Sequence, residues 1–190
     1  MIDTLLRLRS RFDAEAARRR YNLPDRYGVV TLHRPANVDT STAAGEIVRA
    51  LMAVRAELPL ILPLHPRGRA TLEAAGLVDG PGLAIVEPLG YLEFMSLVVG
   101  ASLVITDSGG IQEETTILGV PCLTLRPNTE RPITITNGTN RLVTVEGLSA
   151  AATAALGGIA SKPTEPPPLW DGQAGERIAA SLAEWLTRDG

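Results

Sequence analysis

The residues best suited to chemistry lie in one short stretch, Asp107-Ser108-Gly109-Gly110, with Glu113 and Glu114 about one turn further on. Glycines let a phosphate approach the backbone closely, and the N–H groups and dipole of a helix N-terminus favour negative charge. The Ser108 hydroxyl adds a donor, and a glutamate can accept hydrogen bonds from the vicinal hydroxyls of a ribose. Phosphate and ribose together indicate a nucleotide.

The same stretch also has a purely structural interpretation. Ser108 can serve as the N-cap of a helix, and glutamate in a first helical turn is favourable through the helix dipole alone. The motif is neither GxGxxG nor a P-loop, so it does not choose between nicotinamide, ATP and nucleotide-sugar ligands. Spacing alone leaves both interpretations open.

Further charged residues follow other apolar runs: His33 and Arg34 in "TLHRP", Arg126 after "VPCLTL", and Glu130 and Arg131 in "TERP". Guanidinium groups at strand ends suit a diphosphate. A histidine that is merely satisfied at a strand end is the alternative for His33. Adjacent opposite charges such as Glu130 and Arg131 can pair with each other and fix the loop.

Apolar, β-branched runs alternate with helical patterns along the chain. We predict strands over residues 27–33, 60–65, 83–88, 102–107, 120–125 and 141–145. Near-continuous apolar strands separated by helices are typical of a parallel sheet covered on both faces. The sequence therefore predicts a Rossmann-like, doubly wound α/β domain, in which ligands bind at the carboxyl ends of the strands.

We expect three segments: a connecting helix over 1–22, the Rossmann-like domain over 23–160, and a proline-rich linker with a C-terminal helix over 161–190. One amphipathic helix is expected over 3–20, with Leu5, Leu8, Phe12 and Ala16 on its apolar face. A second is expected over 41–57, with Ser41 as its cap, and a short one after "PRG" ends at about residue 75. Two more are expected over 91–100 and 110–119. Prolines predict a linker over 161–172. The last helix, 174–186, places Ile178, Leu182 and Trp185 on one face, which must dock on this domain or on another.

Composition limits the class of protein. With 190 residues, 45% of them hydrophobic, the chain suits one α/β domain. A net charge of -3 gives no electrostatic footprint for nucleic acid, and the apolar runs are too short to span a membrane. The lone Cys122 excludes an internal disulfide and is expected to be a buried small hydrophobe. No metal or cofactor is predicted, and without a secretory core we expect a cytoplasmic protein.

The stretches "TLHRPANVD", "LPLHPRG" and "EPLGYLEFMSLVVGASLVITDSGGIQEETTILGVPCLTLRPNTERPITITNGTNRLV" resemble, in the same order, those of the non-hydrolysing UDP-N-acetylglucosamine 2-epimerases. The resemblance covers most of residues 3–147 and, more weakly, "DGQAGERI". Members of that family have two Rossmann-like domains facing each other across a cleft, the glycosyltransferase-B architecture. The resemblance implies that this chain corresponds to the C-terminal domain with the interdomain helix. The N-terminal domain is then a partner outside this chain, and a homodimer is a further assembly left open.

The resemblance implies roles for matching residues. Ser108–Gly110 would hold the UDP diphosphate and Glu114 the ribose hydroxyls. Glu113 would be structural or would support the residues that contact the ligand. Phe94, in a "YLEF" stretch where Glu93 replaces the family's proline, would lie beside the uracil. A phenylalanine packed in the core is the alternative for Phe94.

His33 would act at the diphosphate or in catalysis, with Arg34 beside it, and Arg126 would contact the diphosphate leaving group. His65 and Arg67 match a stretch that lies, in bacterial members, near a second nucleotide-sugar site that regulates activity. This sequence departs there from the family's asparagine-containing turn.

The family inverts the sugar at C2 by eliminating UDP, through a 2-acetamidoglucal intermediate, and adding UDP back. Its sugar-facing acid and base belong to the N-terminal domain, and no position here matches them. We therefore expect this chain to bind UDP weakly and not to epimerise by itself. The alternatives are one half of a nucleotide-sugar glycosyltransferase and a non-catalytic nucleotide-binding module.

Overall fold

The structure, a computed structural model, describes residues 1–158 and 165–188, apart from the side chain of Arg67. Its strands are β1 (Gly28–Thr31), β2 (Leu60–Pro63), β3 (Leu83–Val86), β4 (Leu103–Thr106), β5 (Cys122–Leu125) and β6 (Asn140–Val143). They form one 6-stranded sheet in the order β3-β2-β1-β4-β5-β6, and every neighbouring pair is parallel. This is the strand order of dinucleotide-binding Rossmann folds, which confirms the predicted fold class.

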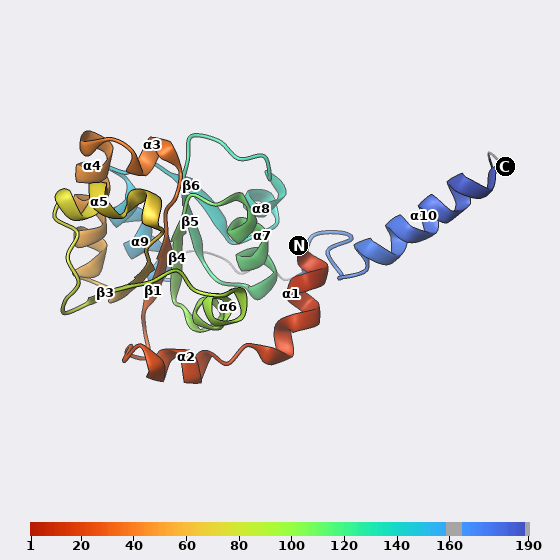
Figure 1. Ribbon diagram of the computed structural model, residues 1–190, viewed down its shortest axis with the longest axis horizontal. Coiled ribbons are helices and arrows are strands. Elements are labelled where there is room, and N and C mark those ends of the chain that lie inside the picture. Colours follow the sequence, from red (N-terminus) through yellow and green to blue (C-terminus); the bar gives the residue numbers. More distant parts are fainter. Residues whose placement is uncertain (159–164, 189–190) are drawn as a thin grey trace.

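Helices cover both faces of the sheet (Figure 1). One face is covered by α4 (Ser41–Arg55), α5 (Pro66–Ala74) and α9 (Leu148–Leu156). The other is covered by α6 (Tyr91–Gly100) and α7 (Gly109–Leu118), and α2 (Ala14–Arg20) and α1 (Ile2–Leu8) pack on α6 and α7 respectively. Two short helices, α3 (Pro35–Val38) and α8 (Ile133–Thr136), lie in the loops after β1 and β5.

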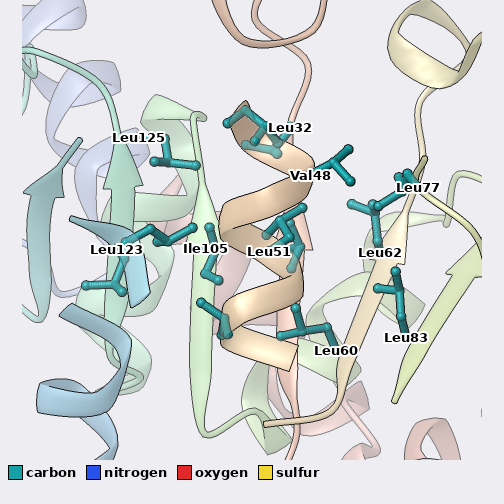
Figure 2. Packing of buried hydrophobic residues seen from close by; sticks show 14 of the residues in the cluster. Leu32, Val48, Leu51, Leu60, Leu62, Leu77, Leu83, Ile105, Leu123 and Leu125 are labelled. Carbon is teal, nitrogen blue, oxygen red and sulfur yellow. The ribbon is translucent and has the colours of Figure 1, made fainter. Parts of the chain in front are cut away.

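The core beneath α4 shows why the strands read as continuous apolar runs. Figure 2 shows Leu51 of α4 among leucine and isoleucine side chains from the central strands. Leu51, Leu62 and Ile105 are fully buried. Because alternate residues of each strand enter this cluster or the one on the opposite face, both sides of the sheet must be apolar.

The prediction of one continuous helix over 3–20 is wrong. A short 3-10 turn (Arg9–Arg11) follows α1, and Phe12 is extended, with φ -79° and ψ 123°. Asp13 then caps α2 by accepting a hydrogen bond from the Ala16 N–H at 2.8 Å. The break resets the helical phase, so Ala17 is buried where Ala16 was expected to be.

Other element boundaries also differ from expectation. Thr40, not Ser41, caps α4, because its hydroxyl accepts the Ala43 N–H at 3.2 Å. The alanine-rich α9 was not predicted, since a run of small residues has little apolar periodicity. The predicted end of α7 is confirmed: Gly119 adopts φ 70°, which a residue without a Cβ accommodates readily. Cys122 is fully buried, as predicted, and burial raises the pKa of its thiol to about 11.

The C-terminal helix α10 (Ala174–Arg188) projects from the body (Figure 1). It forms as predicted, and its first turn is tied to α1, where the Gly175 N–H donates to the Asp3 carboxylate at 2.8 Å. Ile178, Leu182 and Trp185 are between 55% and 61% exposed, so their face meets nothing within the described residues. The predicted linker over 161–172 lies partly outside the described residues. No described helix is long and apolar enough to cross a membrane.

Candidate functional site

The candidate site lies at the carboxyl ends of β1 and β4. These strands are neighbours, and the strand order reverses between them, with β2 and β3 on one side and β5 and β6 on the other. Ligands of open α/β sheets bind outside the carboxyl ends of the strands at such a switch point. Thr31 pairs with Thr106, so the loops that follow the two strands leave the sheet side by side.

Asp107 joins these two loops. It is completely buried, and its carboxylate accepts the backbone N–H groups of His33 at 3.1 Å and of Arg34 at 2.9 Å. It also accepts Asn37 Nδ2 at 3.0 Å and lies 2.9 Å from His33 Nδ1. Arg34 Nε donates to the Asp107 carbonyl oxygen at 2.8 Å. The structure therefore brings His33 and Arg34 beside the Ser108–Gly110 turn.

The start of α7 offers backbone donors to a ligand. Ser108 is its N-cap residue, as the structural interpretation has it, but its side chain makes no capping hydrogen bond within the described structure. Its backbone N–H donates to Thr106 Oγ1 at 3.0 Å. The hydroxyl is thus left for another partner at a helix end that favours an anion.

A buried polar network fixes α7 from behind. The Gln112 side chain is fully buried and donates from Nε2 to the Ser108 carbonyl at 3.1 Å. Its Oε1 accepts Thr129 Oγ1 at 2.6 Å and Asn140 Nδ2 at 3.1 Å. Because buried amide groups must be paired, this network determines where the Ser108 turn can lie.

Arg131 is the arginine that lies against the glycine turn. A Cβ built on Gly109 would be 2.8 Å from Arg131 Nη1. Arg131 Nε donates to Glu113 at 2.5 Å, and its Nη1 is 3.6 Å from Glu130. Glu113 therefore holds Arg131 at the start of α7.

Arg126 forms an ion pair with Glu130, the residue that was expected to pair with Arg131. Its guanidinium is 7% exposed and makes a two-pronged ion pair with Glu130, with N–O distances of 2.8 and 2.5 Å. This pair lowers the pKa of Glu130 to about 2 and raises that of Arg126. The main partner of Glu130 is thus Arg126 rather than Arg131, and a diphosphate contact by Arg126 stays a prediction.

Glu114 is held against α6. It is 5% exposed and accepts the Tyr91 hydroxyl at 2.9 Å. Burial raises the pKa of Glu114, and the negative charge of Glu113 raises it further, while the hydrogen bond from Tyr91 opposes the shift. Burial likewise raises the pKa of Tyr91. One carboxylate oxygen is thus occupied by Tyr91, and the ribose contact stays a prediction.

The two remaining predicted residues lie further from this turn. Phe94 is half-buried and packs against the apolar cluster shared with α1, α2 and α7, which agrees with the core alternative. Its neighbour Glu93 pairs with Tyr21 and Arg20. His65 is exposed where the chain enters α5, one strand away from the switch point. The Arg67 side chain lies outside the described part of the chain.

Sequence reasoning missed several residues that build the site. Asp107 was taken only as part of an acidic turn, and no role was assigned to Asn37, Tyr91 or Gln112. An aspartate directly after a mostly apolar strand was the available signal, because a carboxylate in that position must find donors. Those donors lie 74 and 70 residues away in the sequence, so the pattern could not name them.

Comparison with known proteins gives a consistent result. A family model described as UDP-N-acetylglucosamine 2-epimerase matches residues 1–183. The UDP-N-acetylglucosamine 2-epimerase of Methanocaldococcus jannaschii is 40% identical over 168 residues, which are 84% of this chain and 45% of that protein. The UDP-2,3-diacetamido-2,3-dideoxy-D-glucuronate 2-epimerase of Pseudomonas aeruginosa is 41% identical over 120 residues, 63% of this chain and 33% of that protein.

A solved structure extends the match to three dimensions. The crystal structure of Methanocaldococcus jannaschii UDP-GlcNAc 2-epimerase in complex with UDP-GlcNAc and UDP has a TM-score of 0.83 and 37% identity. The match covers 96% of this chain and 52% of that one. This chain thus spans about half the length of the relatives it matches, and its fold corresponds to half of a glycosyltransferase-B-like molecule.

Proposed function

The chain belongs to the UDP-N-acetylglucosamine 2-epimerase family, and from that membership we propose that it binds the UDP part of a nucleotide sugar at the ends of β1 and β4. The observation that carries the proposal is the contact of Asp107 with His33 and Arg34, which holds two basic side chains beside the start of α7. A helix N-terminus with adjacent cations is complementary to a diphosphate.

The diphosphate would lie over Ser108–Gly110. Backbone N–H groups of the first turn and the free Ser108 hydroxyl are the donors, and the glycines allow close approach. Arg131 already lies over Gly109, so it can meet a phosphate after a small side-chain movement. Arg126 contributes positive charge from a buried position, tied to Glu130.

The nucleoside would extend from there toward α6. Glu114 has one carboxylate oxygen taken by Tyr91, and we assign the other to the ribose hydroxyls. Phe94 lies further along α6 and would border the uracil through its exposed edge. Glu113 supports the site by holding Arg131.

The reaction we propose for the complete protein is inversion at C2 of the sugar. A base removes the C2 proton, the C–H electrons form a C1=C2 double bond, and the C1–O bond breaks so that UDP leaves with the electron pair. Reprotonation of C2 from the opposite face and return of UDP to C1 give the epimer. This chain supplies stabilisation of the leaving diphosphate by N–H groups and cations, with His33 placed to act at its oxygens.

The sugar-facing acid and base would come from the half of the molecule that the relatives have and this chain does not match. We propose that this other half also covers the apolar face of α10. The match to the solved structure covers all but 4% of this chain, which is fewer residues than the 15 of α10, so part of α10 is matched within that longer protein. A homodimer is compatible with the same proposal.

Two other functions compete with this one. A glycosyltransferase half would bind a nucleotide sugar at the same edge of the sheet and transfer the sugar to an acceptor. A non-catalytic module would bind the nucleotide only. The relative from Pseudomonas aeruginosa is named for a different UDP-sugar, so the proposal concerns the UDP part, which both names share.

Calorimetric titration of the chain with UDP tests the proposal. We expect weak, saturable binding that is lost in the double variant Ser108→Ala, Glu114→Ala. Ser149→Ala, in α9 on the opposite face of the sheet, is the matched control and should bind like the unmodified chain. Absence of binding by a folded chain, or equal binding by the double variant, would contradict the proposed site.

A further inference from the structure

Asp107 makes more contacts with the loop after β1 than are needed to hold that loop. Two of its acceptor contacts are to backbone N–H groups, of His33 and Arg34, and these alone would fix the chain path. A third, at 2.9 Å, is to the His33 ring nitrogen Nδ1, and a fourth is to the Asn37 amide. The contact with the ring therefore concerns the orientation of the imidazole.

This contact determines which ring nitrogen carries the proton. An ionised carboxylate is acceptor-only, and the donors around Asp107 fit that state. Nδ1 must then be the protonated nitrogen of a neutral His33 ring, and Nε2 points away from Asp107. The His33 side chain is 48% exposed, so its ring is accessible to a ligand at this edge of the sheet.

We propose that Asp107 is a positioning residue that holds His33 as the Nδ1–H tautomer, with Nε2 directed at the ligand. Its backbone carbonyl holds the Arg34 guanidinium in the same way, through Nε at 2.8 Å. One buried residue thereby sets the orientation of both basic side chains at the switch point. The direction of Nε2 toward a diphosphate rests on the proposed function, whereas the tautomer does not.

The arrangement has a chemical consequence for the ligand. In the neutral ring Nε2 is an acceptor, and in the protonated ring it is a donor, so only this nitrogen can exchange a proton with the bound molecule. Second contacts of this kind fix both the tautomer and the ring orientation of functional histidines. An adjacent helix N-terminus supplies N–H donors to the same ligand.

Nitrogen NMR of the chain labelled with ¹⁵N-histidine tests the proposal directly. The sequence contains two histidines, so His65→Gln assigns both sets of signals. At a pH where the ring is neutral, we expect a protonated-type shift at Nδ1 of His33 and an unprotonated-type shift at Nε2. The Nε2–H tautomer, or averaged shifts, in the unmodified chain would overturn the proposal.

Two variants separate this role from a structural one. Asp107→Asn replaces one acceptor oxygen by a donor and should move His33 toward the Nε2–H form. Asn37→Ala is the matched control, because it removes a different contact to the same carboxylate and should leave the tautomer unchanged. An unchanged tautomer in a folded Asp107→Asn variant would also overturn the proposal. Should that variant not fold, the unmodified chain still decides.

Adding UDP to the labelled chain separates this proposal from the proposed function. We expect the Nε2 signal of His33 to move more than that of Nδ1 as UDP binds. An Nδ1–H tautomer with no response to UDP would support the role of Asp107 and contradict the diphosphate site. An Nε2–H tautomer with a response to UDP would do the reverse.

Discussion

Glu114 combines burial with a proposed contact to the ligand. Its pKa in the folded chain is raised above the ordinary value of 4.5, mainly by burial. The folded state therefore binds this proton more tightly than the unfolded state, and its stabilising contribution is full below pH 4.5 and is lost as pH rises through the folded pKa. Ionising Glu114 in the folded chain therefore costs stability.

Glu114→Gln should therefore raise the free energy of unfolding at pH 7 while weakening UDP binding about tenfold, the effect of losing about 1.4 kcal/mol. The gain in stability should shrink as pH falls below 4.5, because the unmodified glutamate then becomes protonated in both states. Urea unfolding at the two pH values, together with calorimetry, measures both effects. A gain that is equal at both pH values would contradict the role of burial.

Tyr91→Phe is the companion change, since it removes the donor and leaves the buried carboxylate in place. The free energy of unfolding at pH 7 should fall by about 1–3 kcal/mol, the cost of an unsatisfied buried group. In a Glu114→Gln background the loss should be smaller. Equal losses in the two backgrounds would mean that the hydrogen bond to Glu114 is unimportant.

Among the elements, two glycines near α7, Gly109 and Gly138, differ in how much space a side chain would have. A Cβ on Gly138, in the turn before β6, would lie 2.2 Å from the Thr134 carbonyl oxygen and 2.4 Å from Thr116 Oγ1. The atoms nearest to a Cβ on Gly109 would be those at the flexible end of Arg131. The first clash involves backbone and the second can be relieved by a side-chain rotation.

We expect Gly138→Ala to lower the free energy of unfolding by about 1–3 kcal/mol. Gly109→Ala should change it by less than about 1 kcal/mol, because it disturbs one partly exposed ion pair. UDP binding should nevertheless fall in Gly109→Ala, where the Cβ and the displaced Arg131 obstruct the diphosphate. Chemical denaturation and calorimetry of the pair check this, and the opposite ranking of stability would refute it.

The helix α10 allows a second prediction at this scale. Its apolar side chains are exposed, so the double variant Leu182→Glu, Trp185→Glu should leave the unfolding of the chain unchanged within about 0.5 kcal/mol for each substitution. If the other half of the molecule covers this face, the same variant should prevent that half from binding. Thermal unfolding and analytical ultracentrifugation of the mixed halves measure the two effects.

Thr187→Glu provides the control for α10. Thr187 lies on the opposite side of the helix from Leu182 and Trp185 at 100° per residue, so it should affect neither property. A loss of stability in the apolar-face variant would show that α10 packs on this domain. Unimpaired association would show that the other half does not use this face.

For the molecule as a whole, the groups that we propose at the ends of β1 and β4 bind UDP: the start of α7 and the basic side chains would meet its diphosphate, Glu114 its ribose and Phe94 its uracil. No general base is assigned among the described residues. The purified chain should therefore not convert UDP-N-acetylglucosamine to its C2 epimer, as followed by proton NMR of the sugar. Supplying the other half of a relative should restore turnover.

His33→Gln in the reconstituted protein distinguishes genuine turnover from contamination. Turnover that depends on this chain should fall in the variant, whereas turnover by a contaminating enzyme should not. Turnover by the purified chain that His33→Gln abolishes would overturn the assignment of the acid and base to the other half. Transfer of the sugar to an acceptor by the reconstituted protein would instead favour the glycosyltransferase alternative.

The sequence was sufficient to predict the order of the six strands, the helices α4 to α7 and α10, and the positions of the motifs at strand ends. These depend on local properties: apolar runs, helical periodicity and the turn preferences of glycine and proline. The end of α7 at Gly119 and the burial of Cys122 were predictable for the same reason. The resemblance to a family added the roles proposed for the motifs.

Which strand ends meet depends on packing between distant parts of the chain. The order of strands in the sheet depends on how helices pack on both faces, and it brings Asp107 to His33 across 74 residues of sequence. The pairing of Arg126 with Glu130, the change of phase at Asp13 and the exposed face of α10 depend on neighbours in space as well. A residue pattern specifies what a side chain can do, and packing specifies which partner it has.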